Sequence, residues 1–151
     1  MKIDNINKKI IFLLQKDARM TYKEIASELN RSETTIRDRI KAMEKIGIIQ
    51  GYTALIDKTA LGLNFFAIIL GNPNTSSELD KVTNKIKKVK NVMRVYQISG
   101  NKRLAIFMVA PNYKELKEII RSQLLPLGLK DEEIITVLEA DSEFISPLEI
   151  P

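Results

Sequence analysis

Apolar residues recur at helical spacing through the first 47 positions of the chain. They follow i, i+3 and i+4 steps in three successive runs, with polar residues between them. Each run predicts a helix with one apolar face, and three such faces can share a core. The helices are expected over about Asn5 to Asp17, after Thr21, and from Ser32 to Gly47. The predicted core positions are Ile6, Ile10, Leu13, Leu14, Ile25, Ala26, Leu29, Ile36, Ile40, Met43 and Ile46.

Capping residues mark the ends of the second and third predicted helices. Thr21 and Glu24 have the spacing of a capping box, in which each side chain accepts a hydrogen bond from the other residue's backbone N–H. Ser32 is suited to the N-cap of the third helix, and Gly47 to the left-handed position that follows its last turn. A two-residue polar break separates the two helices. This pattern predicts two helices joined by a tight turn.

The polar side of the third helix carries residue types that read DNA. In a helix-turn-helix the second helix of the pair lies in the major groove, with its N-terminal residues at the base edges. Threonine can contact a thymine methyl group, arginine can bind guanine through two hydrogen bonds, and lysine suits phosphate. A solvated helix face is the alternative interpretation. The candidate DNA-binding residues are Ser32, Thr34, Thr35, Arg37, Asp38 and Lys41.

The periodicity of the chain changes after the third helix. Residues 48–57 read as a strand, and Gly62 ends a linking segment over 48–62. A second domain is therefore expected over 63–151, after a helix-turn-helix domain over 1–47.

Short apolar runs and longer amphipathic runs alternate in the second domain, predicting strands and helices. A capping box of Thr75 and Glu78 is expected to open the first of these helices. The predicted elements are a strand over 64–70, a helix opening at Thr75, strands from Val92 to Ser99 and from Leu104 to Ala110, a helix from Asn112 to Leu125, and a strand from Ile134 to Ala140.

This βαββαβ order predicts a ferredoxin-like sandwich, an antiparallel sheet with two helices on one face. The fold class is thus α+β: an N-terminal three-helix, winged helix-turn-helix followed by a ferredoxin-like domain. Val95, Ile106 and Met108 are expected to offer apolar groups to a sheet-to-sheet dimer. A dimer suits DNA reading, because two half-sites about 34 Å apart need two recognition helices.

The composition excludes several kinds of chemistry. The 151 residues include no cysteine and no histidine, which rules out disulfides, thiol nucleophiles, Cys/His zinc sites and imidazole acid–base catalysis. We expect no catalytic site, no metal and no cofactor. The chain is 44% apolar and 28% charged, without a membrane-spanning run or a leader. A cytoplasmic globular protein is therefore expected.

The charge of the chain is unevenly distributed. A net charge of +5 and a pI near 9.4 favour a polyanion partner only weakly. Residues 81–90 hold five lysines, whereas the charged residues after Lys130 are all acidic. We interpret the lysines as the solvated face of an amphipathic helix, with a second DNA contact as the alternative.

Several short motifs within residues 3–62 form a dense pattern. They are LLQKDAR at 13–19, EIA at 24–26, the serine-led third helix, MEKIGII at 43–49, Gly51-Tyr52 and Leu61-Gly62. With these motifs, residues 3–62 resemble the N-terminal domain of the leucine-responsive and asparagine-regulator (Lrp/AsnC) transcription factors, and the βαββαβ order is that of the family's C-terminal effector and oligomerisation domain. The resemblance implies a sequence-specific regulator that binds double-stranded DNA and forms homodimers, commonly assembled into octamers.

The resemblance also implies a small amino-acid effector, bound between dimers near the loop that joins the domain's second and third strands. The corresponding residues here are Ser99, Gly100, Asn101, Lys102 and Arg103. Relatives commonly carry one or two aspartates after the glycine and a threonine near the start of the last strand, where this chain has Asn101, Arg103 and Ile134. We therefore expect an acidic ligand, or none. Ordinary hairpin residues in water are the alternative.

Two other functions are weighed against DNA-dependent regulation. Haem-biosynthesis decarboxylases resemble this two-domain build, but histidine is expected among their catalytic groups and this chain has none. The helical domain is alternatively a protein-docking module. Salt dependence separates DNA binding from protein docking, because phosphate neutralisation makes DNA affinity fall steeply as salt rises, whereas an apolar protein interface barely responds.

Overall fold

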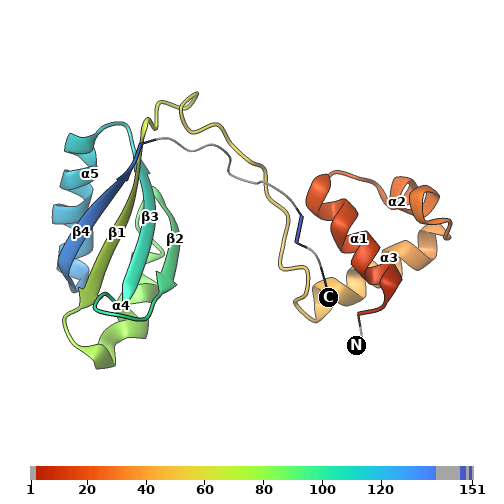
Figure 1. The fold of residues 1–151 in the computed structure, drawn as a ribbon, viewed down its shortest axis with the longest axis horizontal. Coiled ribbons are helices and arrows are strands. Elements are labelled where there is room, and N and C mark those ends of the chain that lie inside the picture. Colours follow the sequence, from red (N-terminus) through yellow and green to blue (C-terminus); the bar gives the residue numbers. More distant parts are fainter. Residues whose placement is uncertain (1–2, 139–146, 149, 151) are drawn as a thin grey trace. The chain divides into compact units, whose positions relative to one another are not determined.

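The computed structural model describes residues 3–138, 147, 148 and 150. The chain divides into two compact units (Figure 1). We call Met1–Leu55 with Ser142–Pro151 the helical unit, and Ile56–Asp141 the sheet unit. The division falls inside the predicted linking segment. In the part of the chain that is described, no helix is long and apolar enough to cross a membrane.

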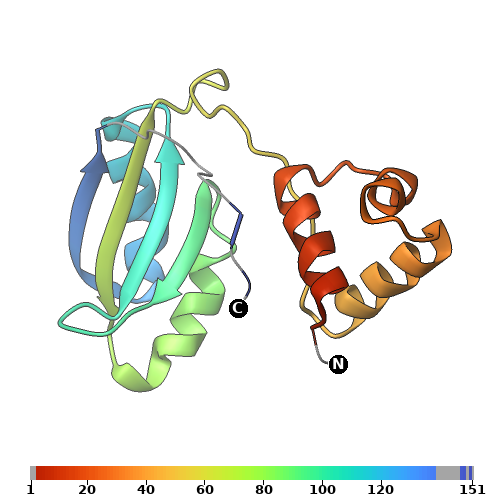
Figure 2. The ribbon, with the colours of Figure 1, turned by 45° about the vertical axis from the view of Figure 1, so that its right-hand side comes forward.

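Three helices form the helical unit, as the sequence predicted. They are α1 (Asn5–Lys16), α2 (Tyr22–Leu29) and α3 (Glu33–Lys45) (Figure 2). The prediction that Ile46 belongs to the core is wrong: it is 50% exposed, because α3 ends one residue before it. The buried core consists of Ile10, Ile25, Ala26, Ile36, Ile40 and Met43.

The predicted helix caps are present in the helical unit. The Thr21 N–H donates to Glu24 Oε2 at 2.7 Å, and the Glu24 N–H donates to Thr21 Oγ1 at 3.2 Å, which completes the capping box. Ser32 Oγ accepts a hydrogen bond from the Thr35 N–H at 3.2 Å. Gly47 has a φ of +77°, in the left-handed region that favours glycine. These contacts fix where α2 begins and where α3 begins and ends.

The segment 48–62 contains no strand, so the strand predicted over 48–57 is wrong for the single chain. A strand needs a neighbouring strand to satisfy its backbone hydrogen bonds. The only described sheet is made of four later strands. Apolar side chains of this segment, among them Leu55 and Leu61, are exposed.

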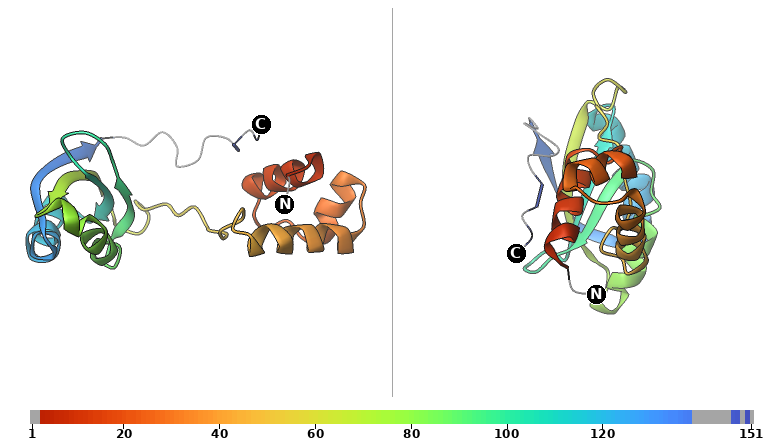
Figure 3. Two further views of the ribbon diagram at one scale, coloured as in Figure 1. Left: turned by 90° about the horizontal axis from the view of Figure 1, so that it is seen from below. Right: turned by 90° about the vertical axis from the view of Figure 1, so that its right-hand side faces the viewer.

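Four antiparallel strands and two main helices form the sheet unit, and both helices cover the same face of the sheet (Figure 3). The strands lie in the order β2-β3-β1-β4. The βαββαβ order is therefore confirmed. The elements are β1 (Phe65–Pro73), α4 (Leu79–Ile86), β2 (Val92–Gln97), β3 (Leu104–Ala110), α5 (Tyr113–Ile119) and β4 (Leu129–Val137).

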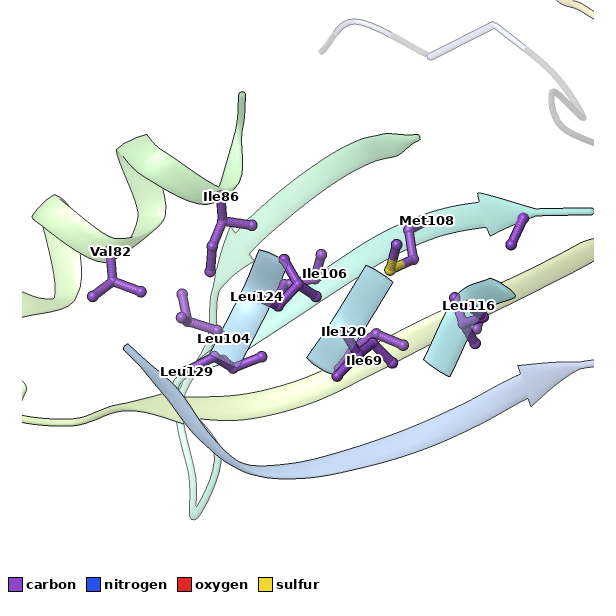
Figure 4. Packing of buried hydrophobic residues seen from close by; sticks show 12 residues of the cluster. Ile69, Val82, Ile86, Leu104, Ile106, Met108, Leu116, Ile120, Leu124 and Leu129 are labelled. Atoms are coloured by element: carbon purple, nitrogen blue, oxygen red, sulfur yellow. The ribbon is translucent and has the colours of Figure 1, made fainter. Parts of the chain in front are cut away.

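The core of the sheet unit lies between the sheet and its helices (Figure 4). Ile69 of β1 and Ile106 of β3 are fully buried there and lie opposite each other in the sheet. Val95 of β2 pairs with Ile106 and shares that face. Met108 is also fully buried in this core. The prediction that Val95, Ile106 and Met108 are available to a sheet-to-sheet dimer is therefore wrong.

The other face of the sheet carries a different apolar set. Its residues alternate with the core positions along β1 and β3, since neighbouring side chains of a strand point to opposite faces. The Phe107 ring lies 6.3 Å from the Phe66 ring and 5.5 Å from the Tyr96 ring, centroid to centroid. Tyr96 and Ile135 are exposed. We call this set the outer face: Phe66, Ile68, Leu70, Tyr96, Ala105, Phe107, Val109, Ile135 and Val137.

Three boundaries in the sheet unit differ from the prediction. β4 begins at Leu129 rather than at Ile134. The prediction missed its first residues because most of them are charged and exposed along a sheet edge, so they give no apolar signal. The Thr75 side chain makes no cap hydrogen bond, and the chain enters α4 through a 3₁₀ turn. The predicted helix after Asn112 becomes α5 followed by a π-helical turn, Ile120–Leu124.

Candidate DNA-binding surface and effector loop

The N-terminal turn of α3 is fixed by two hydroxyl groups. Ser32 Oγ accepts from the Thr35 N–H and lies 2.7 Å from Thr35 Oγ1. Both side chains are therefore engaged in starting the helix, although the sequence placed them among the DNA-binding candidates. Their role in this structure is to hold the first turn in place.

The other four candidates lie on the polar side of α3. Thr34, Asp38 and Lys41 are exposed. The Arg37 side chain is 43% exposed, and its Nε lies 3.9 Å from Asp38 Oδ1. An exposed ion pair of this kind is weak, so the guanidinium keeps its capacity to bind another acceptor. The arrangement presents one threonine, one arginine and one lysine from a single helix face.

One basic residue of α3 faces another helix instead. Arg39 Nη1 lies 2.7 Å from Asp4 Oδ2 and 3.0 Å from Asn7 Oδ1. Asp4 is the N-cap of α1, and its Oδ1 accepts from the Asn7 N–H at 2.8 Å. That hydrogen bond, followed by the Arg39 guanidinium, holds the pKa of Asp4 below its usual 3.8. Sequence reasoning missed the two contacts of Arg39, which join residues 35 and 32 positions apart.

The C-terminal end of α3 is tied to the segment that leaves the helical unit. The Tyr52 hydroxyl donates to Glu44 Oε1 at 2.9 Å. Partial burial, together with this bond to a carboxylate, raises the pKa of Tyr52 to about 12. The phenol therefore keeps its proton at neutral pH and remains a donor. The Gly51-Tyr52 motif was visible in the sequence, but its contact with α3 was not.

The candidate effector loop, Ser99–Arg103, joins β2 to β3 and is braced by β1. The Asn72 side chain of β1 makes two hydrogen bonds to the loop. Its Nδ2 donates to the Asn101 carbonyl at 3.1 Å, and its Oδ1 accepts from the Arg103 N–H at 3.0 Å. Gly100 has a φ of +108°, which favours glycine. The backbone conformation at this position thus explains why the loop has a glycine there.

The two cations of this loop differ in their surroundings. Lys102 Nζ donates to the backbone carbonyl of Asp131 at the start of β4. Arg103 is exposed, and its guanidinium has no ion-pair partner among the described residues. Ile134, which stands near the place of the family's threonine, packs against the core under the helices. Arg103 is therefore the loop cation that is available to an anion.

The lysines of 81–90 lie on the exposed side of α4 and of the turn after it. Lys81 Nζ lies 3.7 Å from Glu78 Oε1, and Val82 and Ile86 are buried underneath. This geometry agrees with the interpretation as a solvated helix face. Within the described residues, no group of three or more potential ligand side chains is placed to hold a metal ion.

Comparisons with known proteins match both units. Residues 3–50 match winged helix-turn-helix DNA-binding domains, and residues 65–142 match the Lrp/AsnC ligand binding domain. The HTH-type transcriptional regulator LrpA of Pyrococcus horikoshii is 36% identical over 122 residues, which cover 81% of this chain and 86% of that protein.

Two solved structures share the fold. The structure of E. coli AsnC has a TM-score of 0.85 at 21% identity, covering 98% of this chain and 100% of that one. A transcriptional regulator from Neisseria meningitidis, solved as a complex with L-Met, has a TM-score of 0.84 at 20% identity, covering 99% and 97%.

Proposed function

This chain belongs to the Lrp/AsnC family of DNA-binding transcriptional regulators, and we propose from this premise how it reads DNA, assembles and responds to a small molecule. The observation that carries the proposal is the polar face of α3, where Arg37 and Thr34 are free to meet base edges. Such a function belongs in the compartment that holds the DNA, in keeping with the predicted cytoplasmic location.

For DNA reading, we propose that Thr34, Arg37 and Asp38 meet base edges and that Lys41 meets phosphate. Ser32 and Thr35 support this contact by holding the first turn of α3. The exposure of the four outward side chains and the match of residues 3–50 to DNA-binding domains support the assignment.

Selection of bound duplexes from a random pool tests this assignment. The bound sequences report base preference and half-site spacing. Arg37→Ala is expected to relax one base position at a cost of about 1–3 kcal/mol, whereas Lys41→Ala weakens all sequences alike and lowers the salt slope by about one. Lys114→Ala, an exposed lysine on α5, is the matched control. Unchanged binding by both α3 variants contradicts the assignment.

We propose that the outer face of the sheet buries itself against a second copy, and that dimers assemble further, as in an octamer. An apolar face that is partly exposed, with three neighbouring aromatic rings, supports this assembly. Light scattering on the purified protein reports the oligomeric state. Ile68→Asp is expected to give monomers, because Ile68 lies between Phe107 and Ile135 in the sheet and a carboxylate buried there has no cation opposite it. Dimers of unchanged stability contradict the proposal.

For the effector, we propose a small acidic molecule rather than a neutral amino acid. The Neisseria relative is described in complex with L-Met, but this chain carries a cation, Arg103, on its candidate effector loop. Lys102 is already engaged with a backbone carbonyl. A free guanidinium pairs with a carboxylate and repels an ammonium group.

Titration calorimetry tests the effector proposal. Aspartate, glutamate and common dicarboxylates are expected to release or absorb heat, and Arg103→Gln is expected to abolish that heat. Lys130→Gln, an exposed lysine at the start of β4, is the control. Heat from leucine alone counts against an acidic effector.

We also propose that the chain has no catalytic activity. The absence of histidine removes a group expected in the haem-biosynthesis decarboxylases of similar build. Added sirohaem is expected to show the absorbance spectrum of the free tetrapyrrole. A shifted band would favour the enzymatic alternative.

A further inference from the structure

Arg39 is a basic residue of the DNA-reading helix that does not face DNA. It follows Arg37 by two positions, which places it about 200° around the helix axis. Its side chain is 30% exposed, and its guanidinium lies against the start of α1. Arg39 Nη1 donates to Asp4 Oδ2 at 2.7 Å and to Asn7 Oδ1 at 3.0 Å. One nitrogen of α3 therefore holds two side chains of α1.

The two partners of Arg39 are themselves joined. Asp4 uses its other oxygen, Oδ1, to accept from the Asn7 N–H. Asn7 is only 2% exposed, so its side-chain oxygen lies where water has little access. A buried amide oxygen without a donor costs free energy, and Arg39 supplies that donor. The three residues thus form a closed polar network between α3 and the first turn of α1.

This network restricts the orientation of α3 in a way that the apolar core does not. The packing of the core cluster, which includes Ile10 of α1 with Ile36 and Ile40 of α3, is non-directional, so it resists separation of the helices more strongly than a small rotation of one past the other. Hydrogen bonds to a planar guanidinium depend on direction as well as distance. Two acceptors on α1 therefore restrict both the rotation of α3 and its position along its axis.

We propose that Arg39 is a positioning residue for DNA recognition, which aims the base-reading side of α3 by fixing that helix to Asp4 and Asn7 of α1. The inference rests on the proposed function of α3. It predicts that Arg39 contributes to the difference between operator and random DNA rather than to phosphate binding. A recognition helix that is rotated from its native orientation loses base contacts before phosphate contacts, since hydrogen bonds to base edges require closer alignment.

The test compares the full-length protein with Arg39→Met, which keeps the aliphatic stem and removes the guanidinium. Affinity is measured for the duplex selected by the wild type and for a random duplex, over a range of salt and well below the unfolding temperature. We expect operator affinity to fall about tenfold. Random-duplex affinity and the salt slope are expected to stay at the wild-type values.

Two further variants and a control complete the test. Asp4→Ser keeps a good N-cap for α1 but removes the oxygen that Arg39 contacts, so it is expected to reproduce the Arg39→Met effect. The double variant is expected to be no worse than the more affected single variant, because both remove one network. Arg39→Lys is expected to recover part of the specificity. Arg121→Met removes a comparable arginine whose ion pair with Glu118 stays within one stretch of the sheet unit, and it is expected to bind like the wild type.

Several results would overturn the inference. An unchanged operator-to-random ratio in Arg39→Met shows that Arg39 does not aim the helix. A salt slope lower by about one, with both duplexes weakened alike, shows that Arg39 meets phosphate. Additive effects of Arg39→Met and Asp4→Ser show that the two residues act separately. If Arg39→Met fails to fold, wild-type specificity in Arg39→Lys likewise shows that Arg39 does not orient the helix. A wild type that selects no duplex refutes the proposed function instead.

Discussion

The two units of this chain are held together by different means. In the described residues, the helical unit has six buried core residues, whereas the sheet unit has twelve. The helical unit adds side-chain ties that join or start its helices, among them the Thr21–Glu24 capping box and the Arg39 network. The sheet unit instead has backbone pairing along β1, β3 and β4, with a register shift between β1 and β4 at Leu70–Asn72.

This difference shows where each unit gets its geometry. A sheet fixes the position of its strands largely through the backbone hydrogen bonds between them. Three short helices have no backbone bonds between them, and a small domain buries proportionally less surface. The orientation of α3, which the DNA-reading function requires, therefore depends on a few named side chains. The substitutions and the pH change below are each expected to lower the stability of one unit more than that of the other.

The largest effect is expected from Ile40→Asp. Ile40 is 1% exposed in the core of the helical unit, so the substitution buries an unpaired charge and should unfold that unit. The sheet unit should keep its own cooperative transition. Amide exchange followed residue by residue measures this difference, with Ile40→Val as the mild control. Simultaneous loss of protection in both units would show that they are not separate.

Gly71→Ala is expected to act on the sheet unit alone. A methyl group at Gly71 would lie 2.6 Å from Leu129 Cδ1 and 3.2 Å from the Lys130 carbonyl oxygen. The first contact can shift with its side chain, but the second is backbone. We expect a loss of about 1–3 kcal/mol in the free energy of unfolding of the sheet unit. Denaturant unfolding measures it, and an unchanged midpoint for this unit would contradict the packing described for β1 and β4.

Thr21→Ala should have a smaller effect, on the helical unit alone. The Thr21 hydroxyl accepts the Glu24 N–H and so caps α2. Its removal is expected to cost about 1 kcal/mol. Thr21→Ser keeps the hydroxyl and serves as the control in thermal unfolding. Equal unfolding temperatures for the alanine and serine variants would show that the cap does not stabilise the unit.

The smallest difference between the units is expected in how their unfolding temperatures respond to acid. Hydrogen bonds from the Thr21 N–H and hydroxyl hold the pKa of Glu24 below its usual 4.5, and the pKa of Asp4 is likewise lowered. A lowered folded-state pKa stabilises the fold above the unfolded-state pKa, and the gain is lost as pH falls through the folded value. Both groups lie in the helical unit. Its unfolding temperature should therefore begin to fall below about pH 4.5, before that of the sheet unit does. The reverse order, measured by calorimetry, would contradict this assignment.

Much of the fold follows from local pattern. The caps at Thr21, Ser32 and Gly47 were predictable because they depend on residues that are close in sequence. The start of β4 was not, since a charged edge strand lacks the apolar alternation of a strand. The strand expected over 48–57 failed for a related reason: its sequence suits a strand, but the described part of the chain offers it no neighbouring strand.

The candidate site was predictable only in part. The family resemblance identified the loop around Gly100, and periodicity identified the polar face of α3. Neither showed that Lys102 is bound to the backbone at Asp131 while Arg103 is free. Nor did periodicity show that Ile106 and Met108 lie under the helices, because a strand with apolar residues on both sides gives no signal for either face.

The sequence by itself determined most of the helices and strands, their order and the family, because helix caps, periodicity and motifs are local properties of the chain. It also placed Arg37 and Arg39 on different sides of α3, since two helical positions differ by about 200°. The tertiary structure alone decided that Arg39 is held by Asp4 and Asn7, while Arg37 keeps only an exposed ion pair with Asp38. Contacts between distant residues depend on how the helices pack, so periodicity does not reveal them.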